Sequence, residues 1–124
     1  MFKEIAAFDR KDIPSALRVL NSGELGDPLA VDDITEFSKE VVPFFAHETN
    51  RTRLLFLTKS DCIGNLIGLE HGGRTIVSFS VNTEKVHRYL EHRTPSSLNR
   101  MVAAKKVQDE GYEVRFRIDP IFEY

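Results

Sequence analysis

Polar and charged side chains follow each of four short apolar runs in this 124-residue chain. Asn21-Ser22-Gly23-Glu24 follows the first run, and Lys59 follows the second. Ser80 and Asn82 end the third run, and Asp119 ends the fourth. Parallel α/β proteins gather functional groups at the carboxyl ends of their strands, so the pattern indicates a polar functional edge. The alternative, that polar residues follow strands because loops face water, stays open on this pattern alone.

Two of the runs also alternate in a way that places polar groups on one face of a strand. Arg115, Arg117 and Asp119 share one face of the last run. The third run carries a similar set, namely Ser78, Ser80 and Asn82. If helices cover the opposite face, these groups line the interior of a curved sheet, where charges need partners. The pattern favours a lumen that holds water or a polar ligand, or else an open edge strand whose charges are solvated.

Stretches of helical character separate these apolar runs. We predict strands at 16–20, 53–58, 75–82 and 112–118. The segment 54–57 is apolar on both faces, which is typical of a parallel strand covered on both sides. Strands that alternate with helices in this way predict a parallel α/β sheet with right-handed crossovers. We expect about four βα units in one domain that spans residues 1–124.

Capping and breaking residues place the helices between the strands. One helix is expected to begin at Asp32 or Asp33 and to end or kink at Pro43. Short helices are expected at 65–69 and 84–90. The apolar positions of the first helix, at helical spacing, are Ile34, Phe37 and Val41.

The clearest helical signal lies between Thr94 and Gly111. Thr94 is the expected N-cap, Pro95 fits the first helical position, and Gly111 fits the C′ position. A period of about 3.6 residues predicts the buried stripe of this helix. The predicted stripe is Leu98, Met101, Val102, Ala104 and Val107.

Composition sets broad limits on function. The net charge of -2, from 17 basic and 19 acidic residues, argues against a free-standing basic module for nucleic acid. Cys62 is the one cysteine, so the chain can form neither an internal disulfide nor a multi-cysteine metal site. Early charges and the lack of a long apolar run predict neither a signal peptide nor a membrane span. We therefore expect a cytoplasmic protein with no membrane partner.

Five strings of residues resemble the spore photoproduct lyase family of radical SAM enzymes, in the same order and at similar spacing. They are Arg18–Asp27, Leu57–Ser60, Thr75–Asn82, Arg93–Arg100 and the pair Gly111-Tyr112 with Ile118–Ile121. The resemblance implies part of a TIM barrel of the radical SAM type. It also implies a 4Fe-4S cluster on a CxxxCxxC motif and S-adenosylmethionine as cofactors. The cluster reduces S-adenosylmethionine to a 5′-deoxyadenosyl radical, which abstracts hydrogen from substrate.

The resemblance also implies roles for single residues. Gly23 and Glu24 stand where these enzymes meet the amino group of the methionine moiety. Lys59 stands where the family pairs with the methionine carboxylate, and Ser80 and Asn82 stand near the ribose. The far side of the site is expected to hold Tyr112 and the turn Asp119-Pro120-Ile121.

The chain departs from the family pattern in three ways. It lacks CxxxCxxC, so we interpret it as an internal fragment that alone binds no cluster, binds S-adenosylmethionine poorly and is inactive. Residues 22–26 lack the hydrogen-donating cysteine of the lyases, and Arg115, Arg117 and Asp119 replace apolar or small residues. The family substrate is a methylene-bridged thymine dimer in DNA, which must be turned out of the helix. These departures favour another, anionic substrate and leave binding of DNA open.

Two other functions stay open from the sequence. The chain could be a stand-alone α/β module that binds a nucleotide or phosphate at the strand ends. It could also be an interaction domain that has lost its catalysis. A partial barrel leaves apolar strand edges unpaired, so a fragment is expected to self-associate through them.

Overall fold

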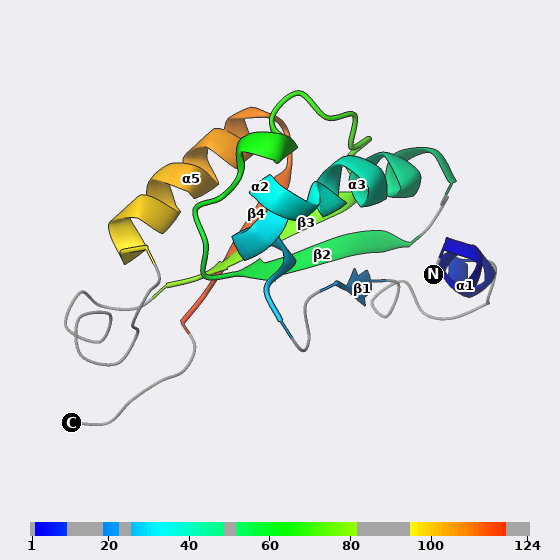
Figure 1. Cartoon of the computed structure of the whole chain (residues 1–124), viewed down its shortest axis with the longest axis horizontal. Helices are drawn as coiled ribbons and strands as arrows, with labels where there is room; N and C mark the ends of the chain where they lie inside the picture. Colours follow the sequence, from blue (N-terminus) through cyan, green and yellow to red (C-terminus); the bar gives the residue numbers. More distant parts are fainter. Residues whose placement is uncertain (1, 10–18, 23–25, 49–51, 82–94, 119–124) are drawn as a thin grey trace.

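A computed structural model of the chain describes residues 2–9, 19–22, 26–48, 52–81 and 95–118. These residues form a parallel sheet with the strand order β1-β2-β3-β4 (Figure 1). Its strands are β1 (Val19–Asn21), β2 (Arg53–Thr58), β3 (Thr75–Ser80) and β4 (Glu113–Arg117). The predicted α/β class with parallel strands is therefore confirmed, and the predicted bounds of β2 are those observed.

The helices α2, α3 and α5 lie on one side of the sheet, while α1 lies beside β1 (Figure 1). The helices are α1 (Phe2–Asp9), α2 (Asp32–Thr35), α3 (Phe37–Glu48) and α5 (Ser97–Asp109), with short 3-10 helices η2 (Pro28–Val31) and η3 (Gly64–Leu66). The sequence analysis did not predict α1, and the helix predicted at 65–69 is reduced to η3. The helix predicted at 84–90 lies outside the described residues. Among the described residues, no helix is both long and apolar enough to cross a membrane.

The hydrophobic core lies between the helices and the sheet. Alternate residues of β2 are buried, and β3 is buried along its whole length. Burial of one large aliphatic or aromatic side chain stabilises a fold by about 1.5–3 kcal/mol. The core side chains of the two strands are Leu54, Phe56, Val77 and Phe79, and those of the helices are Val41, Val42, Phe45, Ala103, Ala104 and Val107. Residues on the other face of β2, Leu55 and Leu57, are only half-buried.

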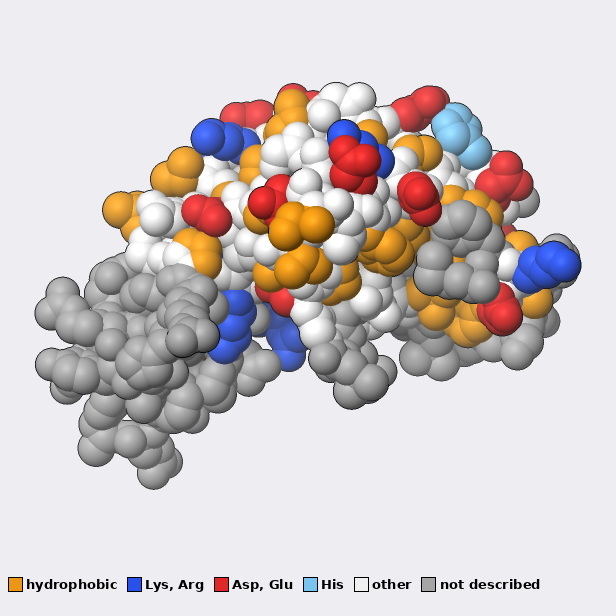
Figure 2. Space-filling view, viewed as in Figure 1, with side chains coloured by type: hydrophobic (Ala, Val, Ile, Leu, Met, Phe, Trp, Pro, Cys, Tyr) orange, Lys and Arg blue, Asp and Glu red, His pale blue; other side chains and the backbone are white. Residues whose placement is uncertain are grey.

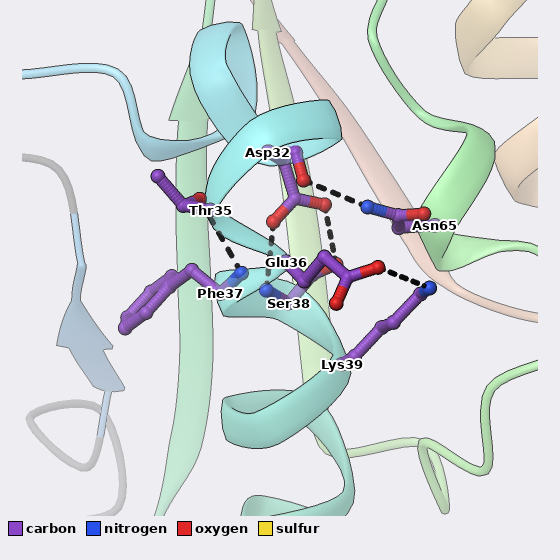
Figure 3. Close-up of polar contacts among 7 residues, drawn as sticks. All are labelled: Asp32, Thr35, Glu36, Phe37, Ser38, Lys39 and Asn65. Carbon is purple, nitrogen blue, oxygen red and sulfur yellow. Dashed lines mark hydrogen bonds and ion pairs between the residues drawn. The ribbon is translucent and has the colours of Figure 1, made fainter.

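The helix predicted to begin at Asp32 is divided in two at Glu36. Glu36 has a φ of 52°, in the left-handed region, and this ends α2. The Asp32 carboxylate accepts hydrogen bonds from the backbone N–H of Ser38, at 2.8 Å, and from the Ser38 hydroxyl (Figure 3). Asp32 therefore caps α3 across the break, because the first N–H groups of a helix lack partners within it.

Two details of this predicted helix differ in the structure. Pro43 is expected from the sequence to end or kink the helix; it lies inside α3, which continues to Glu48, so Pro43 does not end it. The helix continues because neighbouring positions such as Val42 and Phe45 are almost fully buried, at 0% and 1% exposed, and this packing offsets the missing N–H. Ile34 is 82% exposed, because the break at Glu36 changes the direction of the apolar face.

The predicted buried stripe of α5 is also largely wrong. Leu98, Met101 and Val102 are exposed, at 66%, 52% and 49%. Only Ala104 and Val107 of the predicted stripe are buried. The face toward the sheet is instead made of Ser97, Arg100, Ala103, Ala104 and Val107. Small alanine side chains allow the helix axis to approach the sheet closely, so the larger apolar residues are displaced to the outer face.

The start of α5 is shifted relative to its prediction, whereas its end is as predicted. Ser96 is the N-cap, and its hydroxyl accepts a hydrogen bond from the backbone N–H of Asn99 at 3.1 Å. Pro95 therefore precedes the helix, and Thr94 lies outside the described residues. Gly111 follows the helix with a φ of 93°, as expected for a C′ glycine.

Tyr112 lies in the core and not near the far side of the strand-end site as predicted. It directly precedes β4, so it lies at the amino end of that strand. Its hydroxyl donates to the carbonyl of Leu66 at 2.7 Å, and its ring stacks on His71 with centroids 4.0 Å apart. Burial, with a smaller contribution from the charge of Glu110, raises the pKa of Tyr112 to about 12. Its contacts therefore anchor the start of β4 to η3.

A matched pair of substitutions on α5 tests which face of the helix is buried. Val107→Ala removes a side chain that is 0% exposed and should lower the free energy of unfolding by about 2 kcal/mol. Val102→Ala makes the same chemical change at an exposed position and should change it by less than about 0.5 kcal/mol. Urea denaturation followed by circular dichroism measures both. A larger loss for Val102→Ala than for Val107→Ala would restore the stripe predicted from the sequence.

Candidate functional site

The carboxyl ends of the four strands form the candidate site. We define the carboxyl edge as the described residues at or directly after these ends, Ser22, Lys59, Ser80 and Arg117, together with Asp27, which caps η2 after β1 and bonds to the end of β2. The predicted site residues Lys59, Ser80, Arg115 and Arg117 lie in or directly after β2, β3 and β4. The other predicted site residues, Gly23, Glu24, Asn82 and Asp119, lie outside the described residues.

Asp27 joins the loop that follows β1 to the end of β2. One carboxylate oxygen, Oδ2, accepts from the hydroxyl of Thr58 at 2.8 Å and from the backbone N–H of Lys59 at 2.9 Å. The other oxygen, Oδ1, accepts from the backbone N–H groups of Leu29 and Ala30 at 3.2 and 3.3 Å, which caps η2. Hydrogen bonds to an ionised acceptor are stronger than neutral ones. Asp27 therefore joins the start of η2 to the end of β2, where its partners Thr58 and Lys59 lie 31 and 32 residues away in sequence.

The loop after β2 continues this network of hydrogen bonds. The backbone N–H of Ser60 donates to the Thr58 hydroxyl at 2.9 Å, and that of Cys62 donates to the Ser60 hydroxyl at 2.9 Å. Thr58 and Ser60 are buried, at 2% and 8% exposed. Side-chain oxygens thus fix the backbone on both sides of Lys59, so its Cα has a defined position at the carboxyl edge.

The surroundings of Cys62 favour the neutral thiol over the thiolate that nucleophilic or metal chemistry requires. Burial raises the pKa of the Cys62 thiol, a hydrogen bond with the backbone of Asp33 opposes this in part, and the charges of carboxylates such as Asp32 and Asp61 add to the rise. A reactive or metal-binding cysteine needs the opposite shift, because the thiolate is the reactive form. Cys62 therefore acts as a small, half-buried side chain.

Arg100 of α5 bonds to the end of β3 from the helix side of the sheet. The sequence analysis did not predict this residue. Its guanidinium is 0% exposed, and Nη1 donates to the backbone carbonyl of Ser80 at 2.7 Å. Nε donates to the carbonyl of Pro95 at 3.1 Å, so the guanidinium also ties the segment before α5 to the sheet. The only available signal was helical spacing, since Arg100 lies four and seven residues before Ala104 and Val107.

The predicted arginine face lies beside the polar face of β3, as its alternation indicated. Arg115 is in register with Ser78, and Arg117 is in register with Ser80. Both arginines are exposed, because β4 is the last strand of the described sheet. Basic side chains appear at the lower edge of the view in Figure 2, away from the helices. The sequence left two interpretations, a polar interior face and a solvated edge strand. The structure has features of both, because the arginines share the face opposite the helices with Ser78 and Ser80 and also lie on the last strand of the described sheet.

Charge on this face is partly paired. The Oε2 atom of Glu113 lies 3.0 Å from Nη2 of Arg115 and 3.4 Å from Nη1 of Arg53. The Glu113–Arg53 pair crosses from β4 to β2, which lie on either side of β3, whereas the Glu113–Arg115 pair lies within β4. Exposed ion pairs contribute about 0–1 kcal/mol each, so their main effect is to orient the arginines.

Metal chemistry would need ligands beyond the described residues. Within the described ranges, no group of three or more His, Cys, Asp or Glu side chains could hold a metal ion. The full sequence has one cysteine, which cannot supply the three thiolates of a CxxxCxxC motif.

Comparison with known proteins connects this architecture to one family. A family model described as spore photoproduct lyase matches residues 2–124. A spore photoproduct lyase of Clostridium acetobutylicum is 30% identical over 108 residues, which cover 87% of this chain and 32% of the relative. The corresponding protein of a Geobacillus strain is 34% identical over 98 residues, which cover 79% of this chain and 28% of the relative. The chain thus spans about a third of the length of the curated relatives that it matches.

Solved structures show the same fold. A spore photoproduct lyase in complex with dinucleoside spore photoproduct has a TM-score of 0.91 and 28% identity. The match covers 99% of this chain and 36% of that structure. A double mutant of spore photoproduct lyase with bound AdoMet and dinucleoside spore photoproduct has a TM-score of 0.81 and 30% identity, over 86% of this chain.

Substitution of Arg100 tests whether the buried guanidinium supports the carboxyl edge. Arg100→Met keeps the length of the side chain but leaves the carbonyls of Ser80 and Pro95 without these donors. The free energy of unfolding should fall by about 3 kcal/mol, at about 1–3 kcal/mol for each buried group that loses its partner. Lys106→Met removes an exposed cation of the same helix and should have little effect. Equal effects of the two substitutions on urea denaturation would contradict the proposed support.

Proposed function

The chain belongs to the spore photoproduct lyase family, and from this we propose that it is the S-adenosylmethionine-binding portion of a radical SAM enzyme. The observation that carries the proposal is the arrangement of the carboxyl edge. Lys59 lies directly after β2 and Ser80 ends the adjacent strand β3; the backbone there is held because Lys59 N–H donates to the Asp27 carboxylate and Arg100 donates to the Ser80 carbonyl. The likeness to a lyase with bound AdoMet supports this location for the cofactor.

The chemistry of the edge suits the parts of S-adenosylmethionine. We assign Lys59 to the methionine carboxylate, because an ammonium and a carboxylate form a charge-assisted hydrogen bond. Gly23 and Glu24 would meet the methionine amino group, and Ser80 and Asn82 would meet the ribose. With a reduced 4Fe-4S cluster, the bound cofactor would supply a 5′-deoxyadenosyl radical for hydrogen abstraction. The residues of this chain would bind and orient the cofactor, while the three thiolate ligands of the cluster are not among them.

We propose that the substrate is anionic. Arg115 and Arg117 project from the face that carries Ser78 and Ser80, and Asp119 follows them in sequence. Guanidinium groups recognise phosphates through paired hydrogen bonds. A phosphate of damaged DNA would provide such an anion. The arginine face would then select substrates in the complete enzyme.

Because the chain alone is expected to bind S-adenosylmethionine poorly, titration of the ¹⁵N-labelled chain with AdoMet to high, millimolar concentration tests the proposed cofactor site. We expect chemical-shift changes at the backbone amides of Lys59 and Ser80, and little change at Gly73, which precedes β3 at the other end of the sheet. Lys59→Met should weaken AdoMet binding about tenfold, equivalent to about 1.4 kcal/mol, through loss of the ammonium. Lys105→Met, at an exposed lysine paired with Asp109 on α5, is the matched control.

The same titration separates the competing functions. Stronger shifts with ATP or inorganic phosphate than with AdoMet would contradict the proposal and favour a nucleotide- or phosphate-binding module. No shift with any of these ligands would also contradict it and favour an interaction domain. Exposed apolar residues would serve the latter function, and they include Leu98, Met101, Phe116 and Ile118.

A substitution of Arg117 tests the anionic substrate. Arg117→Ala should weaken the binding of a fluorescent oligothymidylate to the chain about threefold to tenfold, and it should reduce the dependence of affinity on salt. Lys106→Ala removes one positive charge from α5, on the other side of the sheet, and should leave the affinity within about twofold. Fluorescence anisotropy at two salt concentrations measures both. An unchanged affinity of the Arg117→Ala variant would remove the arginine face from the substrate site.

A further inference from the structure

We infer that Arg100 of α5 is a positioning residue for the proposed S-adenosylmethionine site, where it acts through the backbone of Ser80. The inference rests on the proposed function, in which the Ser80 hydroxyl meets the ribose of the cofactor. Arg100 is fully buried, so its guanidinium has no surface with which to touch a ligand at the carboxyl edge. Its effect on binding would come from the position that it gives to Ser80.

Ser80 lies at the point where β3 loses its neighbour β2. The last residues of these two strands that are in register are Thr58 and Phe79. Ser80 is still in register with Arg117 of β4, but it lies one residue beyond the pairing with β2. The backbone N–H of Lys59, which follows β2, is bonded instead to the carboxylate that caps η2. The backbone of Ser80 therefore needs a hydrogen-bond partner from outside the sheet on this side.

The guanidinium of Arg100 is that partner. Its Nη1 donates to the carbonyl of Ser80 at 2.7 Å. The N–H of the same peptide unit belongs to Val81, and it donates to the carbonyl of Arg117 at 2.8 Å. Both polar groups of the peptide that follows Ser80 are thus held, one by α5 and the other by β4. A peptide unit is planar, so these two bonds fix its plane and restrict the backbone from which the Ser80 hydroxyl projects.

A second bond sets the place of the guanidinium itself. Nε of Arg100 donates to the carbonyl of Pro95 at 3.1 Å, and Pro95 directly precedes the N-cap Ser96. A guanidinium is a rigid, planar fork, so Nε and Nη1 hold the carbonyls of Pro95 and Ser80 in a defined geometry. The ammonium of a lysine could supply the charge, but it lacks two donors in a fixed arrangement. The position therefore favours arginine.

Hydrogen exchange tests the hold on Ser80 without any ligand. Arg100→Met should raise the exchange rate of the Val81 amide about tenfold relative to that of the Val77 amide, which lies inside β3. Val107→Ala is the matched control, because it destabilises α5 at a buried position without removing a bond to the end of β3. It should raise both rates by the same factor. An equal rise at the two amides in the Arg100→Met variant would overturn the inference.

A double-mutant cycle on AdoMet affinity tests the positioning. Arg100→Met and Ser80→Ala should each weaken AdoMet binding about threefold to tenfold, the range for the loss of one hydrogen bond. Because Arg100 acts through Ser80, Arg100→Met should weaken binding by less than about twofold in a chain that already carries Ser80→Ala. Val107→Ala should leave the affinity within about twofold. Titration to millimolar AdoMet, followed by the amide shifts of the labelled chain, measures all variants.

The outcomes separate this inference from the proposed function. No AdoMet binding by the unmodified chain would overturn both. AdoMet binding that Ser80→Ala weakens and Arg100→Met does not would overturn only the role of Arg100. Additive losses in the double variant, or an equal loss for Val107→Ala, would also overturn it, because they would indicate a general loss of structure. If Arg100→Met does not fold, Arg100→Lys takes its place in the cycle with the same expectations, since it keeps the charge but not the fork.

Discussion

Packing of α3 and α5 on one face of β2 and β3 is the constraint on which the rest of the structure depends. Parallel strands need crossover connections, and these place the helices over one face and all strand ends at shared edges. The buried sides of β2 and β3 then form the core with Val42, Phe45 and Val107. Once these layers are in contact, the positions of the carboxyl edge and of the opposite, polar face follow from the direction of the strands.

Two charged side chains, one half-buried and one buried, fix the backbone at the carboxyl edge through hydrogen bonds. Asp27 joins the loop after β1 to β2, and Arg100 joins the start of α5 to the end of β3. Each side chain forms a hydrogen bond with a backbone group of another segment, Asp27 with the N–H of Lys59 and Arg100 with the carbonyl of Ser80. These backbone groups would otherwise have to bond to water. The edge is consequently more ordered at Lys59 and Ser80 than a set of polar loops would be. Such order suits the binding of a small molecule with several separated polar groups.

The opposite face has a different physical character. Arg53, Glu113 and Arg115 form exposed ion pairs across it, which orient side chains without much stabilisation. Phe116 alternates with Arg115 and Arg117 and is in register with the core residue Phe79, so it lies on the helix side of β4, where it is 52% exposed because β4 is the last strand of the described sheet. The chain also spans about a third of its curated relatives. Its enzymatic activity and substrate therefore remain proposals, while its family and its parallel fold are established.

The sequence by itself determined the four strands in their order, the bounds of β2 and the alternation that brings Arg115 and Arg117 beside Ser78 and Ser80. These features depend on local periodicity, which short apolar runs and a C′ glycine such as Gly111 encode directly. Only the tertiary structure decided which face of α5 is buried, because the helix packs on the sheet through the small side chains of Ala103 and Ala104 while the more hydrophobic Leu98 and Met101 are exposed.

Tertiary structure also decided the polar partners of the site. The bonds of Asp27 to Thr58 and of Arg100 to Ser80 join residues that are 31 and 20 positions apart. Their pairing depends on the register of neighbouring elements, and no local pattern specifies that register. The sequence therefore identified which groups end the strands, and the packing of α5 and of the loop after β1 decided how those groups are held.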